Sequence, residues 1–192
     1  MDEATKAAAR DKAREYLRTR GTLVPAATIA ARVGDAFATL ETFLDAVPPE
    51  LVQRRAWDGE WTIQEITDHL LETHRPGLDE LRCLLAGQRP PGEPIPAGLQ
   101  SKAPHLRPWP WLLRELKEVH AEILTELAGV KPDFETEAHA PLVMVTYATD
   151  ERGEKLALHW VDDLDWKAYS IVWRLHAIDH LHQGRKVLAA VN

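Results

Sequence analysis

The chain has 192 residues, enough for one domain with a substantial apolar core. Its 30 acidic and 23 basic side chains give a net charge of -7, and no block of lysine or arginine forms the basic stripe typical of nucleic-acid binding. The apolar runs are too short to cross a bilayer, and the N-terminus lacks the apolar centre of a signal peptide. We therefore expect a single cytoplasmic domain over residues 1–192 that binds neither nucleic acid nor membrane.

Two helices are predicted at the start of the chain. The first twenty residues are rich in alanine and alternating charges, which predicts an N-terminal helical extension over residues 1–21, ending at Gly21. A second helix is predicted over residues 28–47, before a pair of prolines. Its apolar stripe consists of Ile29, Val33, Phe37, Leu40 and Leu44.

The segment "WTIQEITDHLLETH", residues 61–74, predicts the start of a third helix. Thr62 is a good N-cap, and Glu65 lies where a capping box requires it. Pro76 and Gly77 then interrupt the pattern, so we predict a kink or a short break before the helix resumes. His74 precedes that interruption; a position near a pocket mouth is one possibility, but a surface position is favoured.

A long proline-rich connection is predicted over residues 87–110, because its prolines disfavour a regular helix or strand. Connections of this length in a compact domain are often functional. Trp109 and Trp111 end it and are candidates to cap a pocket. A fourth helix follows, and its apolar face consists of Leu112, Leu116, Val119, Ile123 and Leu127.

Residues 141–161 hold two strand-like runs around "DERGE", which predicts a small β-hairpin; helical continuation through the second run is the alternative. The last helix is predicted to begin near Asp165 and to run almost to the end of the chain. Four long amphipathic helices dominate the pattern. The predicted fold class is therefore all-α: a four-helix bundle with an extra N-terminal helix, a long loop and a hairpin insertion.

Two histidines on the last helix, His176 and His180, are four residues apart and share one largely apolar face. Burying imidazoles without partners is unfavourable, and such a pair is most often structural, bonded to backbone, water or acids. His69 on the third helix faces the bundle interior or its edge by its spacing. Three histidines from two helices can instead form a site for Zn²⁺ or Ni²⁺ that keeps positions open for water.

Four further residues are candidates to support these histidines or to line a pocket. Asp179 neighbours the histidine pair, where it either orients an imidazole or is solvated. Gln183 lies on the same face and is suited to bind a water or a substrate, or to close a core hydrogen bond. Glu65 lies one turn before the third-helix histidine, although its capping role is favoured. Trp173 shares the histidine face of the last helix.

The remaining histidines are weaker candidates for a metal site. His182 is predicted to point away from its neighbour at position 180. His139 and His159 flank the predicted hairpin and could line a cleft. The histidines that have no partner at a strong motif spacing also include His74, His105 and His120.

Two of these segments together resemble a known family. "WTIQEITDHL" resembles the tryptophan-Ser/Thr…His-Leu signature of the DinB/YfiT-like superfamily, and "HAIDHLHQ" resembles its second signature, His-x-x-x-His followed three residues later by Gln. The order and separation of the two segments match over roughly residues 28–190. The resemblance implies a metal-binding four-helix bundle with His69, His176 and His180 as the ligands.

The resemblance also implies a range of functions. The family includes thiol-dependent S-transferases that use bacillithiol, mycothiol or glutathione, a mycothiol-dependent maleylpyruvate isomerase and metal-dependent hydrolases. It therefore implies a metal-dependent transferase or hydrolase that acts on a small molecule. A divalent metal, with zinc or nickel favoured, and a low-molecular-weight thiol are the implied cofactors, and a homodimer is the implied assembly.

Two alternatives to an enzyme remain at this stage. One is a non-catalytic metal-binding or metal-stabilised module that binds a ligand or protein, and the other is a metal-free helical interaction protein. The chain also departs from the compact family pattern in its N-terminal helix, its proline-rich loop and its 141–161 insertion. Because these segments are expected around the pocket mouth, the family's substrates do not transfer to this chain.

Overall fold

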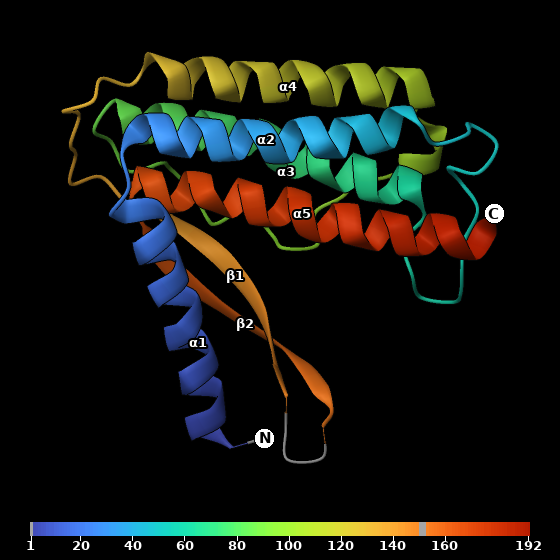
Figure 1. Ribbon diagram of the computed structural model, residues 1–192, viewed down its shortest axis with the longest axis horizontal. Coiled ribbons are helices and arrows are strands. Elements are labelled where there is room, and N and C mark those ends of the chain that lie inside the picture. The colour runs from blue at the N-terminus through green and yellow to red at the C-terminus, as the bar shows by residue number, and fades with distance from the viewer. Residues whose placement is uncertain (1, 150–152) are drawn as a thin grey trace.

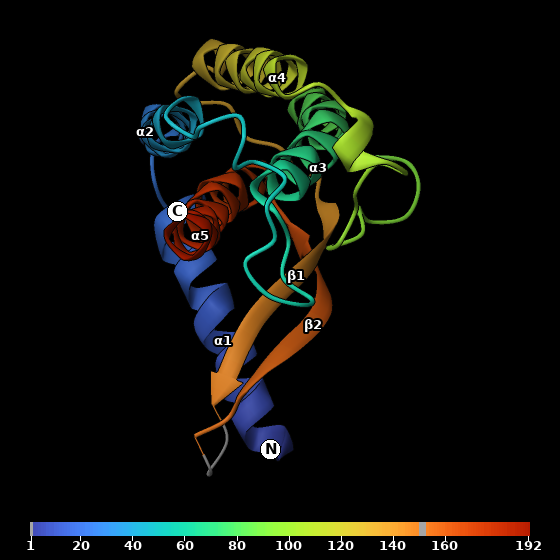
Figure 2. The same ribbon diagram turned by 90° about the vertical axis from the view of Figure 1, so that its right-hand side faces the viewer.

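The computed structural model describes residues 2–149 and 153–192. Within them, four long helices form a bundle (Figure 1): α2 (Ala26–Asp45), α3 (Ile63–Leu85), α4 (Trp109–Gly129) and α5 (Trp166–Val191). Seen nearly end-on, α2 and α3 lie on opposite sides of the bundle, and each contacts both α4 and α5 (Figure 2). The predicted four-helix bundle is confirmed.

The core lies between the predicted apolar stripes. Every residue of the α2 stripe and every residue of the α4 stripe is buried, because the 3.6-residue period places them all on the inward face. Close approach of α5 to α2 depends on Gly184, where a Cβ would lie 2.7 Å from Cε1 of Phe43. The bundle thus follows directly from the periodicity of the sequence.

Helix α1 (Glu3–Leu17) and a π-helix (Arg18–Thr22) form the predicted N-terminal extension. Figure 1 shows α1 projecting from the bundle at the end where α2 begins. A Cβ on Gly21 would lie 2.8 Å from the Cα of Ala168, so a glycine at this corner lets the chain close onto α5. No single described helix has both the length and the apolar character to cross a membrane; only Glu3–Thr22 taken together with α2, at a bend of 112°, meets that test.

The hairpin prediction is also confirmed. Strands β1 (Ala140–Thr149) and β2 (Lys155–Leu164) pair antiparallel in a register that joins Ala140 to Leu164. Of the predicted "DERGE" turn, residues 150–152 lie outside the described residues. The hairpin runs beside α1 (Figure 1), and Arg14 of α1 donates three hydrogen bonds to Asp162 of β2, at 2.9, 3.0 and 3.2 Å.

Helix α3 differs from the prediction at Pro76 and Gly77. The helix continues through both residues, so the predicted break is absent. Pro76 cannot donate a backbone hydrogen bond, but Gly77 packs against α5, where a Cβ would lie 3.3 Å from Trp173. Since the helix continues, His74 is fully buried. The prediction that His74 lies at the surface was wrong because tertiary packing overrides the local signal of Pro-Gly.

The proline-rich connection between α3 and α4 contains one short 3₁₀ helix (Pro104–Leu106). It is tied to α3 by Gln64, whose amide donates to the carbonyls of Pro104 and Arg107 at 2.9 Å. Trp109 is buried in the first turn of α4 and Trp111 lies under the guanidinium of Arg107. Neither tryptophan lines the cavity described below, so their predicted role as a pocket cap was wrong.

Candidate metal centre

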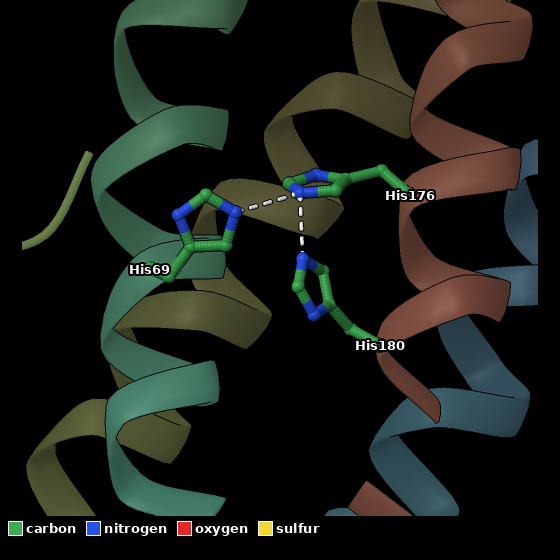
Figure 3. Close-up of side chains that lie close together, drawn as sticks. All are labelled: His69, His176 and His180. Atoms are coloured by element: carbon green, nitrogen blue, oxygen red, sulfur yellow. Dashed lines mark hydrogen bonds between the residues drawn. The ribbon is translucent and has the colours of Figure 1, made fainter. Parts of the chain in front are cut away.

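Three histidine side chains converge between α3 and α5 (Figure 3). The Nε2 atom of His176 lies 2.9 Å from Nε2 of His69 and 3.0 Å from Nε2 of His180. One nitrogen of each side chain falls within a cluster no wider than 4.8 Å. The i, i+4 spacing brings two of them onto one face of α5, and the packing of α3 on α5 adds the third.

His69 is oriented by the proline-rich loop. Its Nδ1 lies 2.7 Å from the carbonyl oxygen of Leu99, which can only accept, so Nδ1 carries the proton and Nε2 carries a lone pair. The loop is anchored one residue earlier on α3, because the buried carboxylate of Asp68 accepts from the backbone N–H and the hydroxyl of Ser101 at 2.8 Å. The loop therefore determines the tautomer of His69.

His180 is oriented by Gln183, one turn further along α5. The Nε2 of Gln183 donates to the Glu60 carboxylate at 2.6 Å, and this turns its Oε1 toward Nδ1 of His180 at 2.7 Å. Because Oε1 only accepts, Nδ1 of His180 carries the proton and Nε2 again carries a lone pair. Gln183 thus supports the cluster by hydrogen bonding to one of its imidazoles.

His176 is held by a row of hydrogen bonds. Its Nδ1 lies 3.0 Å from Nε2 of His74, whose Nδ1 lies 3.1 Å from Nε2 of His120. The Nδ1 of His120 in turn lies 2.6 Å from a carboxylate oxygen of Glu41, which accepts its proton. When each imidazole is neutral, every Nδ1 in the row donates toward Glu41. The Nε2 of His176 is then a third lone pair in the cluster.

Burial keeps these imidazoles neutral. Desolvation lowers the pKa of His69, lowers that of His176 well below its usual range, and lowers that of His180 to about 4. The pKa of His120 is also lowered by burial, even though Glu41 acts in the opposite direction. Neutral imidazole is the form that binds metals.

The arrangement fits a divalent transition-metal ion. The Nδ1 proton of each imidazole is donated to another acceptor, so the Nε2 contacts of 2.9 and 3.0 Å have no donor. Three lone pairs that point toward one another repel. A cation among the three nitrogens converts this repulsion into coordination, and imidazole nitrogen is a donor that zinc and nickel accept. Trp61 covers the cluster from one side, with its ring 4.9 Å from that of His69 and 6.0 Å from that of His180.

A cavity of about 480 Å³ opens next to the cluster, and His69 and His176 are part of its lining. Its walls come from α1, strand β1, α5 and residues Ile95 and Ala97 of the proline-rich loop. The three segments that depart from the compact family pattern therefore surround the pocket, as expected. Because the wall is mostly apolar, the cavity suits a small, largely apolar ligand.

The other predicted site residues divide into two groups. Trp173 and Asp179 line the cavity. The carboxylate of Asp179 accepts no hydrogen bond from any residue that the structure describes, and it does not hold an imidazole. Glu65 lies away from the cluster, since it completes the capping box with Thr62 and pairs with Arg55 at 2.9 Å. Its capping role, favoured from the sequence, is confirmed.

The weaker histidine candidates include two that the sequence reasoning undervalued. His74 and His120 are buried beside the cluster, and the available signal was the position of His120 in the apolar stripe of α4, between Leu116 and Ile123. His105, in the 3₁₀ helix of the loop, lies instead beside the start of α3, where its Nε2 is 3.2 Å from the hydroxyl of Thr62. Of the others, His182 is exposed, as predicted, whereas His139 and His159 do not line the cavity.

The fold and the site together define a helical bundle with a histidine cluster at the wall of a cavity. The family model of the DinB superfamily matches residues 33–163, and the chain belongs to this superfamily. The matched segment contains His69 and ends before α5, which carries the other two histidines.

A solved structure has a similar fold. "YfiT from Bacillus subtilis", described as "a probable metal-dependent hydrolase with an unusual four-helix bundle topology", superposes with a TM-score of 0.59 at 15% identity, covering 88% of this chain and 95% of that one. At this identity the likeness shows a shared fold. No curated protein sequence matches the chain.

Proposed function

We propose that this protein is a metal-dependent hydrolase that acts on a small, largely apolar ester or amide. The observation that carries the proposal is the convergence of three lone-pair nitrogens at the wall of a cavity large enough for a substrate. His69, His176 and His180 would hold the ion, for which zinc or nickel suits three imidazoles. The description of YfiT as a probable metal-dependent hydrolase supports the same reading.

The ion would supply Lewis-acid chemistry, which acidifies water and polarises a carbonyl group. Asp179 lines the same cavity, and its carboxylate, which accepts no hydrogen bond from the described residues, is suited to accept the proton that an attacking water loses. The apolar side chains of β1 and α1 that line the cavity would contact the apolar part of the substrate. The site thus has a place for the ion, a proton acceptor and a binding surface.

Thiol transfer is the second candidate. Lys12 lies in the wall of the cavity and forms no ion pair within the part of the chain that the structure describes. An ammonium group so placed could pair with a carboxylate of a low-molecular-weight thiol such as glutathione. Membership of a superfamily that includes thiol-dependent transferases supports this candidate. A metal-stabilised module without catalytic activity is the remaining alternative, in which the ion joins α3 to α5 and the cavity only binds a ligand.

Metal analysis tests whether the three histidines bind an ion. Protein purified without a histidine tag is analysed for metals beside the variant carrying His69→Ala, His176→Ala and His180→Ala. We expect one divalent ion per chain in the wild type and none in the variant. A wild type that takes up no zinc or nickel after reconstitution would refute the metal site.

Activity tests separate the candidates. The loaded protein is assayed on a panel of apolar esters and amides, and separately for conjugation of glutathione, mycothiol or bacillithiol to electrophiles. We expect hydrolysis that stops when the ion is removed. Conjugation alone would favour thiol transfer, and stabilisation by the ion without either activity would favour the non-catalytic module.

Asp179→Asn tests the proton acceptor. We expect kcat to fall by about a hundredfold or more, the usual contribution of a positioned base, while the metal content stays unchanged. Asp35→Asn on α2, an exposed carboxylate that does not line the cavity, is the control and should retain full activity. Unchanged kcat in the Asp179 variant would remove this residue from the proposed mechanism.

A further inference from the structure

The row of hydrogen bonds behind His176 goes beyond what metal binding requires. We propose that Glu41 is a positioning residue of the metal centre, acting through His120 and His74 to keep Nε2 of His176 free for the ion. The inference rests on the metal site proposed above, and it assigns a role to three residues that are not ligands.

The row crosses the whole bundle. Glu41 lies on α2, His120 on α4, His74 on α3 and His176 on α5, so each helix contributes one residue. The three contacts measure 2.6, 3.1 and 3.0 Å from Glu41 inward. His74 and His120 are 0% and 1% exposed, whereas the side chain of Glu41 is 25% exposed. A carboxylate near the surface is thereby connected, through two buried imidazoles, to the partly buried histidine cluster.

The carboxylate gives the row one direction. A neutral imidazole has one N–H and one lone pair, so the state of one end determines the state of the next. With Glu41 as acceptor, each ring donates outward from Nδ1. The reverse arrangement would place a lone pair against the carboxylate at 2.6 Å and an N–H of His176 at the ion's position. Glu41 therefore disfavours the tautomer that cannot bind metal.

Packing alone does not explain these residues. His120 stacks on Phe37 with ring centroids 3.7 Å apart and an interplanar angle of 8°, a ring contact that does not require the two nitrogens of an imidazole. Buried imidazoles are unfavourable unless both nitrogens have partners. Here every nitrogen of His74 and His120 has a partner within the row. An acceptor hydrogen-bonded behind a ligand imidazole orients it and raises its basicity.

The test compares zinc affinity, measured by competition with a chromophoric chelator, and the Co²⁺ absorption spectrum across a set of variants. Glu41→Ala should weaken zinc binding by about tenfold, the lower end of the effect of such partners, and should shift the Co²⁺ bands. Glu41→Gln retains an acceptor oxygen without the charge and should lose less. Asp45→Ala is the matched control, because Asp45 lies one turn further along α2 and pairs with Lys117 of α4 at 2.7 Å.

The variants Glu41→Ala and His120→Phe, alone and combined, test whether Glu41 affects zinc affinity through His120. If Glu41 acts only through His120, the double variant should bind zinc no more weakly than His120→Phe alone, since the two changes break the same path. A purely structural contribution would give additive losses instead.

Three results would overturn the proposal. The first is a Glu41→Ala variant with the zinc affinity and Co²⁺ spectrum of Asp45→Ala. The second is additive losses in the double variant. The third is a wild type that binds no ion, which refutes the metal site itself and the role of Glu41 with it; the first two results leave the metal site standing.

Discussion

The Nε2 atoms of His69 and His176 lie 2.9 Å apart, although 107 residues separate the two histidines along the chain. The contact depends on the close packing of α3 on α5 near Gly77, where a side chain would meet Trp173 and Tyr169 at 3.3 Å. Helix α5 by itself offers two nitrogens at i, i+4 spacing. The third nitrogen, which turns a common pair into a candidate metal centre, comes from this contact between two helices.

Removing His69 should abolish stabilisation by metal. In the wild type, zinc at about a hundred times its dissociation constant should raise the free energy of unfolding by about 2.7 kcal/mol. His69→Ala should lose nearly all of this gain, because the ion would then bridge no helices. Urea unfolding with and without zinc measures it. The exposed His182→Ala variant is the control, and an equal loss in it would contradict the assignment.

Gln183→Leu should weaken metal binding by about tenfold, because Nδ1 of His180 then loses the acceptor that holds its tautomer. Zinc competition measures the change. Glu60→Gln provides the comparison. The Gln183 amide now donates to the Glu60 carboxylate at 2.6 Å, and the variant retains an oxygen that can accept this hydrogen bond, so its zinc affinity should fall less. If Gln183→Leu bound zinc as the wild type does, the proposed orientation of His180 would be wrong.

The link between α1 and the hairpin should weaken in acid. Burial alone would raise the pKa of Asp162, but hydrogen bonds from Arg14 and Trp160 outweigh it and lower the pKa below its ordinary value of 3.8. A depressed carboxyl pKa stabilises the folded state above the ordinary value, and this contribution is lost as the pH falls through the lower folded value. Since Arg14 is half exposed, we expect about 1 kcal/mol or less.

The variant Asp162→Asn checks this link. At neutral pH it should unfold at lower urea than the wild type, with faster hydrogen exchange in α1. The difference between the two proteins should shrink as the pH falls below 3.8. A difference that stays constant or grows in acid would show that the ion pair is not its source.

Two glycine substitutions should change the free energy of unfolding in opposite directions. Gly21→Ala places a Cβ 2.8 Å from the backbone of Ala168, which cannot move without shifting α5, so we expect a loss of about 1–3 kcal/mol. Gly34→Ala in α2 meets only Leu124 at 3.6 Å, an ordinary contact, and should stabilise by about 0.5–1 kcal/mol through helix propensity. Chemical denaturation measures both. Equal effects would contradict the close approach at Gly21.

Much of the fold was predictable because its signals are local. The apolar stripes of α2 and α4, the capping box at Thr62 and the start of α5 after Asp165 are all confirmed. Each depends on residues within a few positions of one another. The Pro76–Gly77 signal failed for the same reason: it predicts a local break, but contacts of Gly77 with α5 act over a long sequence distance.

The sequence by itself determined most of the secondary structure, the bundle class and three histidines at helix positions that face the bundle, because periodicity and spacing are properties of short segments. Only the tertiary structure decided that the three nitrogens converge, and that Leu99, Gln183 and the row ending at Glu41 turn a lone pair of each toward the others. Those partners come from a loop, from α5 and from three other helices. A hydrogen bond depends on distance in space, which the spacing of residues along the chain does not contain.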